Sequence, residues 1–229
     1  MVAKSSSLSA KLNWLRAGVL GANDGIVSTA GIVMGVAGAT DNGSALLIAG
    51  LAGLVAGALS MAGGEYVSVS SQKDTELAAV QNVRSTLAAD PTKALDELTQ
   101  IYTQRGLDPD LADQVARAYA SKDAVAALTE ARYSISAHEQ TSPWAAAVAS
   151  FVSFTVGALI PLIVMVGSPA SIRVVATIVA VIVALALTGS VSAWLGHARI
   201  LRAVLRNCFV GALTMGVTYL VGHVVQLNL

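Results

Sequence analysis

This chain has little charge, few aromatic residues and a single cysteine. Only 12% of its 229 residues are charged, about half the fraction usual in soluble domains, whereas 55% are hydrophobic and the mean hydropathy is +0.66. This composition excludes an ordinary water-soluble globular domain and indicates an integral membrane protein. The lone Cys208 excludes an intramolecular disulfide and a CxxC metal site.

The chain also lacks the common catalytic motifs. It has no HExxH, no Walker A loop and no glycine-rich dinucleotide fingerprint after a strand, and His138, His197 and His223 are widely spaced. No set of residues supplies a nucleophile, a base and oxyanion donors together. We therefore expect neither an enzyme nor an ATP-driven pump, and we expect no prosthetic group and no nucleic-acid partner.

Long apolar stretches account for most of the sequence. A membrane-spanning helix needs roughly 20 apolar residues. Four stretches are near this length: Trp14 to Ala39, Trp144 to Gly167, Ile172 to Leu195, and Ala203 to Leu227. A fifth span is expected in the run from Gly50 to Glu76, whose first half is apolar. The first one begins too late and extends too far for a signal peptide, so the first helix is expected to remain in the protein. The sequence predicts an all-α integral membrane protein that crosses the lipid bilayer five times.

The basic residues predict how these helices are oriented. Lys and Arg are retained preferentially in short cytoplasmic segments. If the N-terminus is cytoplasmic, every Lys and Arg except Arg173 lies on the cytoplasmic side. We therefore expect a cytoplasmic N-terminus and a C-terminus outside, in a multi-pass protein of a bacterial plasma membrane.

A more polar segment separates the second and third spans. The expected organisation is residues 1–80 for transmembrane helices 1–2, 81–142 for a cytoplasmic helical insert, and 143–229 for transmembrane helices 3–5. Within the insert, Asp90 is a candidate N-cap followed by Pro91, and Gly106 is a stop signal. Asp108 and Pro109 are expected to begin a second helix, and a third is expected over Lys122 to Ile135.

The polar residues inside the spans are the candidates for function. Asp24 lies about 12 Å beyond Arg16 along the first span, and a carboxylate at such a depth usually has a functional role, although it could instead bond neighbouring helix ends. Met61 and Glu65 lie one turn apart on the second span. A thioether beside a carboxylate suits a borderline divalent cation such as Fe²⁺, and Mn²⁺ also accepts carboxylates, but Met61 alone could be core packing. Glu76 extends the polar face towards the cytoplasm, either as a cation path or as a solvated helix face.

Small residues recur every fourth position in the first two spans, as at Gly21 and Gly25 or at Gly53 and Gly57. This spacing allows close helix contacts in lipid. It fits packing within one chain and dimerisation equally well.

Several segments resemble the vacuolar iron transporter family, which includes nodulin-21-like and bacterial members. They are LRAGVLGANDGIVSTAGIVMGVAGA, AGALSMAGGEYVSVSSQKDTE, IYTQRGLDP, SFTVGALIPL and RNCFVGALTMGVTYLVG, in the expected order. The resemblance implies a homodimer of five-helix subunits that exchanges cytosolic Fe²⁺ or Mn²⁺ for protons near an interface formed by spans one and two. Asp24 and Met61 match the family's first-span carboxylate and second-span methionine. The carboxylate that plant members place eight residues before this methionine falls at Gly53, so Glu65 is expected to substitute for it.

The insert departs further from this family. In iron-storing members it is a metal-binding domain rich in glutamate. Alignment through RGLDP retains Glu97 and Asp108 as metal ligands, but places Gln100 and Leu111 at other ligand positions and Arg132 at another. The resemblance therefore implies a reduced metal site in the insert.

The leading hypothesis is a divalent-metal transporter that moves Fe²⁺ or Mn²⁺ out of the cytosol by proton antiport. The expected ligands are Asp24, Met61 and Glu65, with Glu76, Glu97 and Asp108 towards the cytoplasm. The alternative is a membrane metal sensor or scaffold that does not transport, in which the insert binds a partner.

Overall fold

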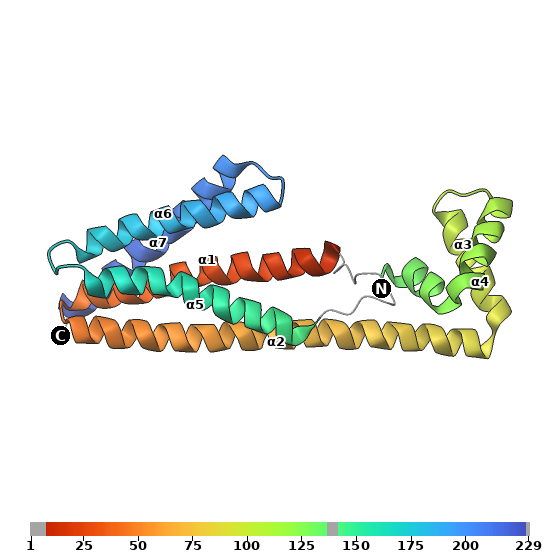
Figure 1. Cartoon of the computed structure of the whole chain (residues 1–229), viewed down its shortest axis with the longest axis horizontal. Helices are drawn as coiled ribbons and strands as arrows, with labels where there is room; N and C mark the ends of the chain where they lie inside the picture. Colours follow the sequence, from red (N-terminus) through yellow and green to blue (C-terminus); the bar gives the residue numbers. More distant parts are fainter. Residues whose placement is uncertain (1–7, 137–141, 228–229) are drawn as a thin grey trace, which may run out of the picture. The chain divides into compact units, whose positions relative to one another are not determined.

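The computed structural model describes residues 8–136 and 142–227, and the side chains from residue 17 onward within them. Lys4 and His138 lie outside the described residues. Within them the regular elements are seven α-helices and no strands. They are α1 (Leu8–Ala39), α2 (Gly43–Ala89), α3 (Pro91–Gln104), α4 (Pro109–Tyr133), α5 (Pro143–Gly167), α6 (Arg173–Leu195) and α7 (Ile200–Leu227) (Figure 1).

Five of these helices, α1, α2, α5, α6 and α7, are long and apolar enough to cross a membrane. The prediction of an all-α membrane protein with five spans is thereby confirmed. The outer surface agrees, because α6 exposes Val175, Val179, Val183 and Leu187 at four-residue intervals. An exposed apolar stripe of this kind is suited to lipid rather than to water.

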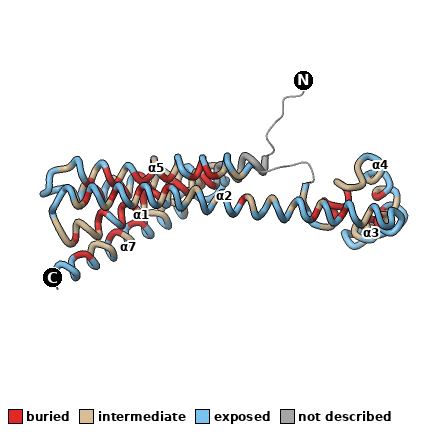
Figure 2. Tube along the Cα trace, turned by 90° about the horizontal axis from the view of Figure 1, so that it is seen from below, coloured by how far each residue is buried: buried red, intermediate tan, exposed pale blue. Residues whose placement is uncertain are grey.

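The chain divides into two compact units, one of residues 1–67 and 143–229 and one of residues 68–142. In the first unit, α1 packs against α5, α6 and α7, while α6 also packs against α5 and α7. Figure 2 shows the buried residues gathered on the inner faces of this bundle. Its core includes the fully buried side chains of Ile26, Met34, Phe154, Leu185 and Met215.

Glycine allows α1 to approach α5 closely. A Cβ added to Gly25 would overlap the backbone carbonyl of Phe154, and one added to Gly157 would overlap that of Ala22. Small residues are expected at such helix contacts in lipid. The four-residue glycine spacing is therefore used, at least in part, for packing within one chain.

The part of α2 in the first unit packs in a different way. Its glycines receive large side chains from neighbouring helices: Leu162 lies against Gly50, Ile32 against Gly53 and Phe154 against Gly57. The opposite side of this part of α2 is largely exposed (Figure 2).

The second unit contains the end of α2 together with α3 and α4, around a core that includes Val83, Leu98 and Leu128. The predicted N-cap is confirmed, because the Asp90 carboxylate accepts hydrogen bonds from the backbone N–H groups of Thr92 and Lys93. Gly106 adopts a φ of +101°, a conformation that favours glycine and ends the α3 segment.

The predicted break between the second and third helices of the insert is only partly correct. The helix that begins at Pro109 continues through residue 122 to Tyr133 and ends two residues before Ile135. A kink replaces the predicted gap, since Asp123 has φ −160° and ψ 96°. Its carboxylate accepts a hydrogen bond from the backbone N–H of Ala126 at 2.9 Å, as an N-cap does.

Candidate metal site

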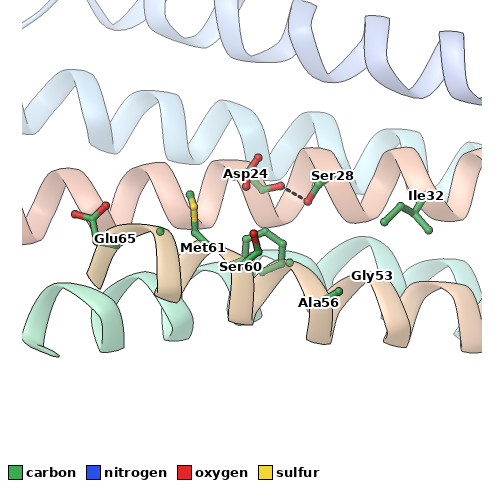
Figure 3. Close-up of a pocket in the computed structure, with 11 residues that line it drawn as sticks. Asp24, Ser28, Ile32, Gly53, Ala56, Ser60, Met61 and Glu65 are labelled. Carbon is green, nitrogen blue, oxygen red and sulfur yellow. Dashed lines mark hydrogen bonds between the residues drawn. The ribbon is translucent and has the colours of Figure 1, made fainter. Parts of the chain in front are cut away.

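A cavity of about 530 Å³ lies beside α1 and α2 in the first unit. Asp24 from α1 and Met61 and Glu65 from α2 all line it (Figure 3). The remaining lining residues are Ser28, Ile32, Gly53, Ala56, Gly57, Ser60, Gly64 and Phe154. Three of the six residues proposed as metal ligands from the sequence therefore share one cavity.

Helical geometry explains how α2 presents its two donors. Residues four apart lie on the same face of a helix, which places Met61 and Glu65 on adjacent turns. Figure 3 shows the Met61 side chain extending from α2 towards α1, where Asp24 is located. The Met61 and Glu65 side chains are half-buried, whereas Asp24 is exposed to the cavity.

The wall of the cavity also contains two serine hydroxyl groups and an aromatic side chain. Ser28 lies one turn after Asp24, and its hydroxyl donates to the Asp24 backbone carbonyl at 2.6 Å. Its oxygen lone pairs remain free to accept or to coordinate, as do those of Ser60. Phe154, from α5, contributes an aromatic ring that is only 1% exposed.

These donors suit a particular kind of cation. The cavity offers two carboxylates, one thioether and two hydroxyls. Oxygen ligands suit Mn²⁺ and Fe²⁺, and a single soft sulfur favours the more borderline Fe²⁺ over Mg²⁺. Among the described residues, no group of three or more His, Cys, Asp and Glu side chains is arranged to hold a metal. A cation in this cavity would therefore depend on the mixed donor set rather than on a cluster of charged ligands.

The other three residues proposed from the sequence belong to the second unit and have different partners. Glu76 accepts a hydrogen bond from the Gln72 side-chain amide at 2.9 Å. Asp108 accepts one from the backbone N–H of Asp110 at 3.0 Å and so caps α4. The roles of these two carboxylates as metal ligands stay predictions.

Glu97 forms an ion pair with Arg132. Both of its carboxylate oxygens accept hydrogen bonds from the Arg132 guanidinium, one of them at 2.7 Å from Nε. Arg132 also donates to the Asn82 side-chain carbonyl at 2.9 Å. The hydrogen bond to Glu97 raises the pKa of Arg132 above its usual value, so its positive charge is permanent.

Sequence reasoning missed Ser28, Ser60 and Phe154. The two serines could have been found, because Ser28 follows Asp24 by one turn and Ser60 precedes Met61 directly. Phe154 carried no such signal, since its position depends on how α5 packs against α1 and α2.

The chain is similar to known proteins over most of its length. A family model described as the VIT family matches residues 15–223. The chain is 42% identical over 220 residues to a vacuolar iron transporter of Acanthamoeba castellanii, covering 96% of this chain and 81% of that protein. It is 39% identical to vacuolar iron transporter homolog 1 of Oryza sativa subsp. japonica, covering 92% and 73%, and 35% identical to homolog 2 of Arabidopsis thaliana, covering 92% and 84%.

Proposed function

Because this chain belongs to the VIT family, we propose that it is a membrane transporter of divalent transition metal, with Fe²⁺ or Mn²⁺ as the transported substrate. The observation that supports this most is the cavity in which Asp24, Met61 and Glu65 lie together. The relatives, named as iron transporters or their homologs, support metal transport as the activity.

The two carboxylates suggest how transport is coupled to protons. A carboxylate must be deprotonated to bind a metal, so metal entry displaces protons and metal release allows them to return. With Asp24 and Glu65 both ionised, a divalent cation is neutralised, and two protons can take its place. We propose proton antiport on this basis.

We propose that the metal leaves the cytosol while protons travel inward. With the N-terminus cytoplasmic and the C-terminus outside, metal enters from the cytosol past Glu65 and Met61, reaches Asp24, and leaves on the far side. We propose the plasma membrane of a bacterial cell as the location.

We also propose that the protein is a homodimer. The family resemblance implies it, and α2 offers a surface for it, an exposed apolar stripe of Ile48, Leu51, Val55 and Leu59 that is equally suited to lipid. Mass measurement of the purified chain in lipid nanodiscs would test this, and a monomer at working concentration would contradict it.

Proteoliposomes provide the direct test of transport. The full chain is reconstituted with a pH-sensitive dye inside, and Fe²⁺ or Mn²⁺ is added outside. We expect saturable metal flux with proton movement in the opposite direction. Asp24→Asn or Glu65→Gln should each lower the metal flux at least roughly tenfold, because even the loss of a residue that only orients a metal ligand typically has an effect of that size.

Asp41→Asn is the matched control, because Asp41 is an exposed carboxylate of the same unit that does not line the cavity. Wild-type flux in both Asp24→Asn and Glu65→Gln would contradict the assigned ligands. Complete absence of flux from the unmodified chain with either metal would favour the sensor or scaffold alternative.

A further inference from the structure

The last three helices of the chain carry an unusual charge distribution. From residue 143 to residue 229 the sequence contains no Asp and no Glu, but it contains four arginines. Three of them, Arg199, Arg202 and Arg206, fall within eight residues of one another. This part of the molecule therefore has a local positive charge with no acidic residue in the same segment.

These three arginines lie on the α7 side of the turn that connects α6 to α7. α6 ends at Leu195 and α7 begins at Ile200, and Figure 1 shows the short loop between them. Arg199 directly precedes α7, while Arg202 and Arg206 lie one turn apart near its start. Since both helices are membrane spans, this turn marks the level at which the chain leaves the apolar part of the bilayer.

The protein itself provides no counter-charge in the described residues. All three arginines are exposed, and neither of the two ion pairs found in residues 8–136 and 142–227 involves them. The first turn of α7 has no acidic residue. The positive end of the α7 dipole adds to the charge of the arginines, so the arrangement attracts an anion.

A cavity lies at the same turn. Its volume is about 470 Å³, and Trp194, His197 and Ile200 are among the residues that line it. The Trp194 side chain is 71% exposed, and Leu201 in the first turn of α7 is 70% exposed. An exposed tryptophan at the end of a span is suited to the boundary between headgroups and acyl chains.

We propose that this turn binds an anionic phospholipid, with its headgroup phosphate held by Arg199, Arg202 and Arg206 and its glycerol and upper acyl region against Trp194. Arginine recognises phosphate through paired N–H donors, and basic residues at a span end attract anionic lipid. Basic residues that only orient the spans need no cavity and no exposed tryptophan, so the combination favours a lipid site.

Tryptophan quenching tests this in the full-length protein. The chain contains three tryptophans, and Trp14→Phe with Trp144→Phe leaves Trp194 as the only reporter. This protein is placed in phosphatidylcholine vesicles that contain an equal small fraction of either brominated phosphatidylglycerol or brominated phosphatidylcholine. We expect stronger quenching by the anionic lipid, and a loss of relative affinity of roughly fivefold for each arginine replaced by glutamine.

Matched variants separate a lipid site from a general charge effect. R199Q/R202Q/R206Q should abolish the preference, the corresponding triple lysine variant, which keeps the charge but loses the paired N–H donors, should retain only part of it, and Arg173→Gln at the other end of α6 should leave it unchanged. Inorganic phosphate at millimolar concentration should not reverse the quenching. Equal quenching by both lipids in the parent, a preference retained in the glutamine triple variant, or displacement by free phosphate would each overturn the proposal.

Native mass spectrometry provides an independent measurement on the unmodified chain. Released from mixed-lipid nanodiscs, the wild-type protein should retain phosphatidylglycerol in preference to phosphatidylcholine. Variants with one, two or three of Arg199, Arg202 and Arg206 replaced by glutamine should retain progressively less phosphatidylglycerol. Equal retention of the two lipids by the wild type would overturn the proposal even if the tryptophan variants fail to fold.

Discussion

Met61 is the only sulfur donor that lines the cavity, so its thioether distinguishes this site from one made of oxygen ligands alone. Fe²⁺ accepts a soft ligand more readily than Mn²⁺ does. We expect Met61→Leu, which keeps the side-chain volume, to lower the Fe²⁺-to-Mn²⁺ preference by roughly fivefold, or about 1 kcal/mol. Competition between the two metals in proteoliposomes measures this ratio.

Ser60→Ala is a useful control for Met61→Leu, because it alters the neighbouring residue on the cavity wall without removing sulfur. It should reduce the transport of both metals to a similar extent. An unchanged preference in Met61→Leu would mean that Met61 packs against the core and does not bind the metal.

Gly57 is needed for the packing of Phe154 rather than for backbone freedom. A Cβ at Gly57 would overlap the buried Phe154 ring, whereas one at Gly63 would meet nothing within 4 Å. We expect Gly57→Ala to destabilise the protein by about 1–3 kcal/mol, as overpacking does. Gly63→Ala should be neutral or stabilising, since alanine is the better helix former. Thermal unfolding in detergent compares the two, and equal melting temperatures would contradict this packing.

The ion pair between Glu97 and Arg132 joins α3 to α4 within the second unit. Its side chains are only 35% and 20% exposed, whereas those of Asp113 and Arg117, a pair within α4, are 42% and 64% exposed. The bidentate and less exposed pair of Glu97 and Arg132 should contribute more to the free energy of unfolding than the pair within α4, because exposed ion pairs typically contribute under about 1 kcal/mol.

We therefore expect Arg132→Gln to lower the local stability of the second unit by about 1–2 kcal/mol. Arg117→Gln should have a much smaller effect. Hydrogen exchange of peptides from α3 and α4, measured in the full-length protein, reports the effect of each substitution. Equal effects of the two substitutions would contradict a structural role for Arg132, and faster exchange on adding a chelator would instead indicate a metal bound in this unit.

The helices were largely predictable from local signals, but the surroundings of the site were not. Apolar length located the five spans, and Asp90, Pro91 and Gly106 marked the ends of α3 because capping depends on nearby residues. Asp123 was harder to interpret, since its cap lies inside a helix that continues beyond it. The pairing of Phe154 with Gly57 could not be predicted, because it depends on the relative register of two helices.

The orientation of the whole molecule remains a prediction from its arginines and lysines, and the lone cysteine makes it easy to test. In a Cys208→Ser background, single cysteines replace Ala170, in the α5–α6 connection, and Lys122, in the insert; both positions are exposed. With a cytoplasmic N-terminus, a membrane-impermeant maleimide should label only the first in intact cells and both after lysis. Labelling of position 122 in intact cells would contradict the proposed orientation.

The contact between Ile32 and Gly53 bears on whether this chain could acquire a carboxylate at position 53, where the family resemblance implies one for plant members. A side chain at position 53 would meet the Cδ1 atom of Ile32, so Gly53→Glu on its own would first have to displace it. Because Cδ1 ends a flexible side chain, Ile32 can move aside at a small energetic cost, and a smaller residue at position 32 should make Gly53→Glu only modestly easier to accept.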